Sequence, residues 1–311
     1  FAIDRGVTVR ATPLPGPLVM AHAVDLREQE VLDTAQPSHA ATGWRAFVHG
    51  TVAELSAAGH PVRAARLEIR GDVPRGGGLS SSAALGCALA LALLGVAGVE
   101  DPDRRALAAL CSRVENDWVG APTGRLDQYA ALLSQPGEAL RIDFAFDTLD
   151  RVPMALGDWR LAVVRAGSRT LAGSAYADRR AECAEAAGRL GVHTLRWAER
   201  DAADDLPEPY RSRALHVVDE NARVEAAVAA LAAGDLPALG AILDASHASL
   251  RDAFEVSTPA AEAVRDRLRV AGSRLIGGGF GGHLLCLVEP GAELPRGARE
   301  VTPSAGASLR V

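Results

Sequence analysis

The sequence contains no lysine, because all 33 of its basic residues are arginines. A Walker-type phosphate loop needs the lysine of the pattern G-x-x-x-x-G-K-[ST], and a protein kinase needs a lysine on its third strand. Enzymes that form a Schiff base with their substrate need a lysine amine as well. The absence of lysine excludes all three classes. Any phosphate bound by this chain must therefore be held by backbone amides, hydroxyl groups and a metal ion.

Basic blocks and aromatic residues are also scarce. The net charge is −6, the arginines form no basic block, and only 4% of the residues are aromatic. Proteins that bind nucleic acid use a basic surface for the phosphates and aromatic side chains for stacking on the bases. We therefore expect no nucleic-acid partner.

Long apolar runs and metal-type cysteine spacings are missing too. The longest apolar run, residues 83–98, is short and interrupted by glycines, which favours a buried helix over a membrane span. The cysteines are scattered, and two of them lie in apolar runs, as is typical of reduced core residues in the cytosol. We expect a cytoplasmic protein without a membrane partner. The four cysteines are Cys87, Cys111, Cys183 and Cys286.

The chain of 311 residues, with 48% hydrophobic and 23% charged residues, is typical of a globular protein of two domains. Apolar residues alternate in several stretches, mostly in the first half, and follow a helical period in most of the second half. These patterns predict the α+β class, with domains at 1–155 and 156–311. Strands are expected at 1–11, 67–69, 138–144 and 159–167, and helices at 83–98, 102–119, from 125, at 176–191, 216–235, 236–254 and from 258.

The stretch PRGGGLSSSAAL, residues 74–85, stands in front of the longest apolar run. Glycines let a backbone approach a ligand closely, and the amides at a helix start point toward a negative charge. The stretch predicts a phosphate cradle, although an ordinary loop with a serine N-cap explains it equally well. The cradle would consist of Gly76, Gly77, Gly78, Leu79, Ser80, Ser81 and Ser82.

Two acidic residues lie near expected helix ends. Asp127 stands in the first turn of a helix, where the dipole keeps a carboxylate ionised, although simple capping explains it as well. Glu115 lies near the end of the preceding helix, where the dipole disfavours its charge; a metal ion would compensate that charge, and so would a solvated surface. One of the serines of the cradle could supply a hydroxyl ligand to Mg²⁺.

A second glycine run, residues 277–282, has five glycines in six positions between apolar stretches. A run of this kind is either a flexible bend or a place where two backbone segments approach closely.

These segments together resemble one family. PRGGGLSSSAA resembles the second motif of the GHMP small-molecule kinases in its galactokinase form, and VENDWVGAPTGRLDQ resembles the galactokinase stretch E-x-x-x-x-G-x-x-x-G-x-M-D-Q. GSRLIGGGFGGHLLCLV resembles the third, glycine-rich motif of the superfamily. HVVDENARV and SHASLRDAFEVS resemble helices specific to galactokinases. The resemblance covers essentially the whole chain in the right order.

The resemblance implies a two-domain GHMP kinase fold, with a ribosomal S5-like N-terminal domain and a ferredoxin-like C-terminal domain. It implies a monomer that uses ATP and Mg²⁺ to convert α-D-galactose to galactose 1-phosphate. Gly76 to Ser82 would wrap the ATP phosphates, and Ser82 and Glu115 would hold Mg²⁺. Asp127 would contact the anomeric hydroxyl as a base or as an orienting charge, and Tyr176 would contact the sugar. Another sugar kinase of the superfamily, such as an N-acetylhexosamine kinase, and a galactokinase-like binding protein remain alternatives.

Two departures from the family pattern have different weight. Arg125 and Leu126 replace an apolar residue and a methionine before Asp127, which bears on packing more than on chemistry. The family's first motif, an arginine followed by Glu-His-x-Asp, would precede FAIDRG and is absent. We therefore expect this chain to be shorter than its gene product and weakly active.

Overall fold

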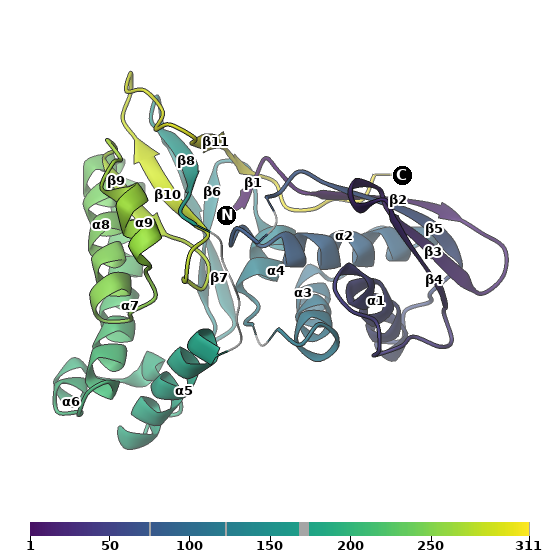
Figure 1. The fold of residues 1–311 in the computed structure, drawn as a ribbon, viewed down its shortest axis with the longest axis horizontal. Coiled ribbons are helices and arrows are strands. Elements are labelled where there is room, and N and C mark those ends of the chain that lie inside the picture. The colour runs from purple at the N-terminus through teal and green to yellow at the C-terminus, as the bar shows by residue number, and fades with distance from the viewer. Residues whose placement is uncertain (75, 122, 168–173, 311) are drawn as a thin grey trace. The chain divides into compact units, whose positions relative to one another are not determined.

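The structure is a computed structural model, which describes residues 1–74, 76–121, 123–167 and 174–310. The chain forms two compact units (Figure 1), the first made of residues 1–74, 80–136 and 303–311 and the second of residues 75–79 and 137–302. These units are not the contiguous ranges 1–155 and 156–311 expected from the sequence. Chain order alone does not reveal that residues 75–79 group with a later part of the chain and that residues 303–310 return to an earlier part.

The first unit contains a four-stranded sheet in the order β2-β5-β3-β4. Strand β3 runs parallel to β5, and the other neighbours are antiparallel. Val19, Ala21, Leu67 and Ile69 are buried on one face, as the two-residue period of a strand requires. The strands are β2 (Val7–Pro13), β3 (Leu18–Ala23), β4 (Glu28–Asp33) and β5 (Ala65–Gly71).

The strand expected over residues 1–11 is interrupted. Strand β1 (Ala2–Ile3) pairs with β12 (Pro303–Ser304) instead of joining the sheet. Beyond β12 the chain lies along the end of a helix of the first unit, where Gly306 N donates to Ser134 O at 2.8 Å and Ala307 N donates to Ala131 O at 2.7 Å. The segment 303–310 therefore completes the first unit after the chain has passed through the second.

Four helices complete the first unit. Helix α2 lies along the sheet, with α1 and α3 on its far side (Figure 1), and contacts β2, α1, α3 and α4. Most of its residues are buried, which explains why its sequence is apolar all round. The helices are α1 (Trp44–Ala57), α2 (Ser81–Val96), α3 (Arg104–Arg113) and α4 (Leu126–Leu133).

The helix expected over 102–119 is shorter than the pattern indicated. Asp103 is the N-cap of α3, since its side chain accepts from Arg105 N at 2.9 Å and Ala106 N at 3.2 Å. After Arg113 the chain continues as a π-helical turn (Val114–Trp118). Turns of this type interrupt the regular backbone ladder and occur often at functional sites.

The second unit contains an antiparallel sheet in the order β11-β8-β10-β9 and a separate hairpin of β6 and β7. Ala162, Val164, Leu275, Leu284 and Cys286 belong to the core beneath the sheet. The strands are β6 (Glu138–Asp143), β7 (Thr148–Pro153), β8 (Arg160–Arg165), β9 (Gly272–Leu275), β10 (His283–Val288) and β11 (Arg299–Val301).

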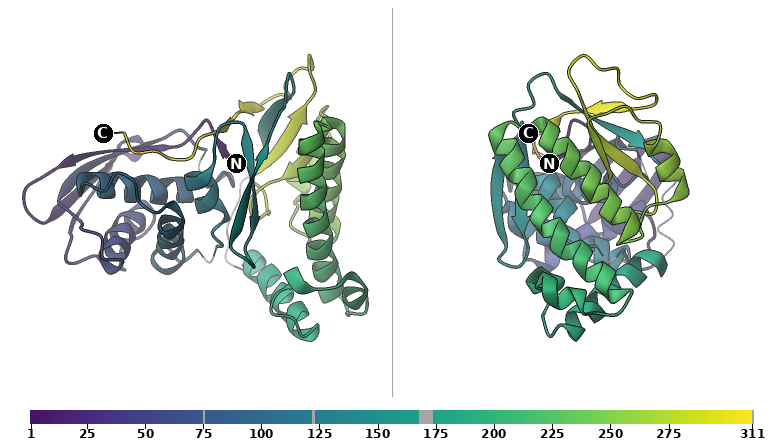
Figure 2. Two further views of the ribbon diagram at one scale, coloured as in Figure 1. Left: turned by 180° about the vertical axis from the view of Figure 1, so that it is seen from behind. Right: turned by 90° about the vertical axis from the view of Figure 1, so that its left-hand side faces the viewer.

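Helices cover one face of this sheet. The long helices α7 and α8 lie side by side, and α8 packs against β9 (Figure 2). Thr258 caps α9, since its side chain accepts from Ala261 N at 3.2 Å. The helices are α5 (Ser174–Arg189), the short α6 (Arg200–Asp204), α7 (Tyr210–Ala233), α8 (Leu236–Asp252) and α9 (Pro259–Arg265).

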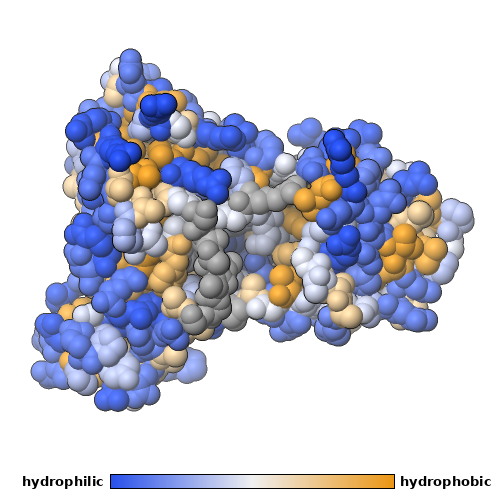
Figure 3. Space-filling view, in the orientation of Figure 1, coloured by the Kyte–Doolittle hydropathy of each residue, from blue (hydrophilic) through white to orange (hydrophobic). Residues whose placement is uncertain are grey.

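The visible surface is mainly hydrophilic, and the hydrophobic areas on it are small and separate (Figure 3). Within the part of the chain that the structure describes, no helix has both the length and the apolar character needed to cross a membrane.

Candidate active site

The loop before α2 has a backbone that few residue types adopt. Gly76 and Gly78 have φ angles of 66° and 73°, and Ser80 has a φ of 56°. This left-handed region favours glycine because it has no Cβ. Ser80 occupies the N-cap position of α2, but its side chain makes no capping hydrogen bond. The simple reading of these serines as a helix cap is therefore wrong, and the first amides of α2 receive no side-chain acceptor from the cap.

The second glycine run lies against this loop. The backbone of Gly282 approaches Gly77 so closely that a Cβ on Gly282 would stand 2.9 Å from Gly77 O. His283 Nδ1 lies 2.5 Å from the same oxygen. Both segments belong to the second unit. Of the two explanations for residues 277–282, the close backbone approach is therefore the one that the structure supports.

Glu115 is a buried carboxylate in the π-helical turn, with only 6% of its surface exposed. Gln128 Nε2 donates to Glu115 Oε2 at 2.6 Å. Burial raises the pKa of Glu115, hydrogen bonding to Ser82 opposes the rise, and the negative charge of Asp127 adds to it. Within the described ranges no arginine or histidine pairs with this carboxylate. Its charge is thus left for a group other than these side chains to neutralise.

Asp127 is the second residue of α4 and is half-buried. The N-cap of α4 is Arg125, so Asp127 does not cap the helix, and that alternative is wrong. Its carboxylate makes no hydrogen bond or ion pair with any other residue that the structure describes. The Asp127 carboxylate lies near enough to Glu115 for its charge to raise the pKa of that residue.

Ser82, Glu115 and Asp127 come from α2, the π-helical turn and α4, and the first unit brings the three together. Tyr176 lies in the first turn of α5 in the second unit, where it is half-buried. A contact between Tyr176 and a sugar stays a prediction.

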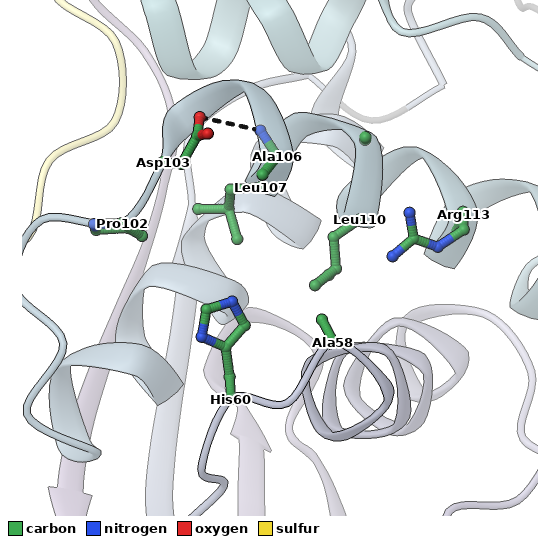
Figure 4. Close-up of a pocket in the computed structure, with 9 residues that line it drawn as sticks. Ala58, His60, Pro102, Asp103, Ala106, Leu107, Leu110 and Arg113 are labelled. Carbon is green, nitrogen blue, oxygen red and sulfur yellow. Dashed lines mark hydrogen bonds between the residues drawn. The ribbon is translucent and has the colours of Figure 1, made fainter.

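A pocket of about 390 Å³ in the first unit lies elsewhere, between the end of α1 and helix α3 (Figure 4). Its walls are mostly apolar, with His60 and Arg113 at its edge. It includes none of the residues to which the sequence assigns a role. The residues to which the sequence assigns a role lie instead in the glycine loop of the second unit and around the two carboxylates of the first unit.

Comparison with known proteins shows the family to which the chain belongs. The profile described as GHMP kinases N terminal domain matches residues 46–135, and the profile GHMP kinases C terminal matches residues 227–307. The chain is 39% identical to the galactokinase of Roseiflexus sp. (strain RS-1), over 93% of this chain and 77% of that protein. The galactokinase of Mycobacterium tuberculosis (strain ATCC 25618 / H37Rv) is 42% identical, over 93% of this chain and 82% of that protein. The chain belongs to the galactokinases of the GHMP kinase family.

Solved structures agree with this assignment. The galactokinase of Lactococcus lactis, determined in complex with galactose, matches with a TM-score of 0.87 at 27% identity, and covers 99% of this chain and 88% of that one. The mevalonate kinase of Methanococcus jannaschii shares the fold, with a TM-score of 0.67 at 15% identity. The resemblance and the two-domain GHMP kinase fold expected from the sequence are confirmed.

A GHMP kinase uses ATP, and the residues of the first unit fit the Mg²⁺ that accompanies it. Carboxylate and hydroxyl oxygens, as on Glu115 and Ser82, are the ligands that Mg²⁺ prefers. Gln128 Oε1 is buried without a hydrogen-bond partner in the described structure, so a polar atom remains for water or an ion. No group of three or more His, Cys, Asp or Glu side chains that could hold a metal ion occurs in the described ranges.

Two residues at the site were not singled out from the sequence. Gln128 is fully buried and holds Glu115, while His283 is hydrogen-bonded to Gly77 of the glycine loop. Each directly follows a residue or segment that the sequence did single out, Asp127 in one case and the second glycine run in the other. Their position next to these candidates was the signal in the sequence that could have drawn attention to Gln128 and His283. That position does not reveal what either side chain contacts.

Proposed function

We propose that this GHMP kinase transfers the γ-phosphoryl group of ATP to the anomeric hydroxyl of α-D-galactose, and forms galactose 1-phosphate and ADP. The observation that carries the proposal is the cluster of Ser82, Glu115 and Asp127 at the start of the helix that follows the glycine loop. It combines a set of oxygen ligands suited to Mg²⁺ with a separate, unpaired carboxylate. The choice of galactose as the sugar substrate rests on the similarity to galactokinases.

The glycine loop would bind the phosphates of ATP without any lysine. Positive φ angles at Gly76 and Gly78 turn the backbone so that successive amides can face one anion, and the start of α2 adds its dipole. Ser81 and Ser82 stand in the first turn of the helix, where their hydroxyls are close to the same anion. Backbone amides hold their positions without side-chain rearrangement, which favours precise alignment of the γ-phosphoryl group.

Ser82 and Glu115 would hold Mg²⁺. When bound, this ion neutralises charge on the transferring phosphoryl group. Gln128 Nε2 donates to Glu115 Oε2 at 2.6 Å and holds the carboxylate in place. Ser82 and Thr123 also hydrogen-bond to the Glu115 side chain. The high burial of Glu115 strengthens its attraction for a cation, because little water competes.

Asp127 would accept the proton of the anomeric hydroxyl or orient that hydroxyl for attack. Its carboxylate has no competing partner among the described residues. Phosphoryl transfer depends mostly on positioning and on charge neutralisation, so either role is compatible with this geometry. Tyr176, half-buried on α5, would contact the sugar.

The proposal is tested with protein expressed from its complete gene. Galactose and MgATP should yield ADP in a coupled assay and galactose 1-phosphate by phosphorus NMR. N-acetylgalactosamine, mevalonate and homoserine serve as competing substrates. A higher kcat/KM for the N-acetylated sugar would replace galactose as the substrate, whereas nucleotide binding without turnover would indicate a binding protein.

Substitution of Gly78 by Val should abolish most nucleotide binding. Gly78 has a φ of 73°, which a β-branched residue adopts only under strain of about 1–3 kcal/mol, so the loop would change shape. We expect the Kd for MgATP, measured by isothermal titration calorimetry, to rise by about tenfold or more.

Gly157→Val is the matched control for this variant. Gly157 also has a positive φ, of 54°, and belongs to the same unit, and nothing lies within 4 Å of a Cβ at that position. It should lose stability but keep its affinity for MgATP. If the parent protein and Gly78→Val bind MgATP with equal affinity, the glycine loop does not bind the phosphates.

A further inference from the structure

His283 is a buried histidine whose ring reaches a distant part of the chain. It is the first residue of β10 and is 5% exposed. Its Nδ1 lies 2.5 Å from Gly77 O, although the two residues are 206 positions apart. A carbonyl oxygen only accepts hydrogen bonds, so Nδ1 is the protonated nitrogen in this contact. The histidine therefore donates to the phosphate loop.

The backbone of His283 is fixed on both sides. Strand β10 lies between β8 and β9, with His283 opposite Arg165 in the ladder to β8. The carbonyl of His283 accepts from Ile276 N at 3.1 Å. A side chain that starts from the middle of a sheet has a well-defined origin, and this suits it to hold another group in place.

Gly282 brings the two backbones close enough for this hydrogen bond. Its carbonyl accepts from Ala166 N at 2.7 Å and its amide donates to Gly167 O at 3.4 Å. Its φ is 100°, and a Cβ would stand 2.9 Å from Gly77 O. A larger residue at position 282 would push Gly77 away from the His283 ring.

The peptide between Gly77 and Gly78 has one orientation that suits an anion. A trans peptide is planar, and its C=O and N–H point in opposite directions. Because His283 holds Gly77 O on one side, the amide of Gly78 faces the other side. Glycines on both sides of this peptide would allow it to rotate easily. In the rotated form the carbonyl dipole would point at the phosphates and repel them.

We infer that His283 is a positioning residue of the phosphate loop, which fixes the Gly77–Gly78 peptide so that the Gly78 amide faces the phosphates of ATP. This inference rests on the proposed function. Each contact that carries it lies in the second unit.

The test replaces His283 in protein expressed from the complete gene. His283→Leu removes the donor and keeps much of the volume, whereas His283→Asn places an amide N–H near the position of Nδ1. Dissociation constants are measured for MgATP and for adenosine, together with KM for ATP and for galactose. Adenosine has no phosphate, so its affinity reports on damage that does not involve the loop.

We expect His283→Leu to bind MgATP about tenfold more weakly, the effect of about one buried hydrogen bond, and to raise KM for ATP by a similar factor. The affinity for adenosine and KM for galactose should stay unchanged, and His283→Asn should regain most of the MgATP affinity. His216→Leu is the control, because His216 is also buried in the second unit but bonds to Ser249.

Unchanged MgATP affinity in His283→Leu would overturn the inference and leave the proposed function standing. An equal loss for MgATP and adenosine would also overturn it, since His283 would then be a general structural residue. A parent protein that neither binds MgATP nor phosphorylates galactose would overturn the proposed function and the inference with it. If thermal unfolding shows that His283→Leu is not folded, His283→Ala replaces it in the same comparison.

Discussion

Replacement of Asp127 by Asn should lower kcat for galactose phosphorylation by roughly 10²- to 10⁴-fold, the range that a lost general base or orienting charge produces. Asparagine has the same shape but neither accepts the proton nor carries the charge. The MgATP affinity should stay within about twofold, because the phosphate cradle does not include Asp127. Steady-state kinetics at saturating galactose and calorimetry with MgATP measure the two effects separately.

Asp117→Asn is the matched control for Asp127→Asn. Asp117 is an exposed carboxylate in the π-helical turn, two positions from Glu115. Its replacement should leave kcat unchanged. If Asp127→Asn retains the parent kcat, Asp127 has no role in the reaction. If it loses MgATP affinity and not kcat, Asp127 acts in nucleotide binding.

Replacement of Glu115 by Gln should impair the use of magnesium and at the same time stabilise the free protein. The neutral amide loses the charge that holds the cation, so we expect the Mg²⁺ concentration for half-maximal activity to rise by about tenfold or more. In the absence of metal, the variant no longer buries a carboxylate charge, so its free energy of unfolding should rise. A magnesium titration at fixed ATP and thermal unfolding without metal measure the two effects.

The gain in stability of Glu115→Gln over the parent protein should increase as the pH rises. Burial raises the pKa of Glu115 above its usual value of 4.5 in the folded protein. Below pH 4.5 the carboxyl is protonated in both folded and unfolded states, so the parent and the variant should differ little. As the pH rises through the folded pKa, the parent loses stability and the variant does not. The difference should therefore grow with pH and then level off. A difference that is constant over this range would contradict the burial of an ionised Glu115.

The sequence predicts strands and helices best where one face differs from the other. The strand found as β5 and the helix found as α5 were both expected from such patterns. Strand β3 was not expected. It buries Val19 and Ala21 but exposes Leu18 and Met20, so apolar residues occupy both of its faces. Its period of two is therefore invisible in the hydrophobic pattern.

The candidate active site was predicted from residues whose position along a helix has a physical meaning. Asp127 was singled out because the helix dipole stabilises a carboxylate in the first turn of a helix. Glu115 was singled out because the dipole destabilises a carboxylate near the end of a helix. The structure places Glu115 in a π-helical turn instead of a helix end and buries it, so the alternative of a solvated surface is wrong. The contact of His283 with Gly77 could not be predicted in this way, because no local sequence pattern reveals a contact between residues 206 positions apart.

The return of residues 303–310 to the first unit has a consequence for how the protein is made. Domains usually fold in order as they leave the ribosome, the N-terminal one first. Here the carbonyls of Ala131 and Ser134, at the end of α4, receive their partners from Gly306 and Ala307. Strand β1 also lacks its pairing partner until β12 has been synthesised. The helix that carries Asp127 is thus completed only after the ribosome has translated the whole second unit. A nascent chain that stops short of these residues would therefore carry an unfinished candidate site.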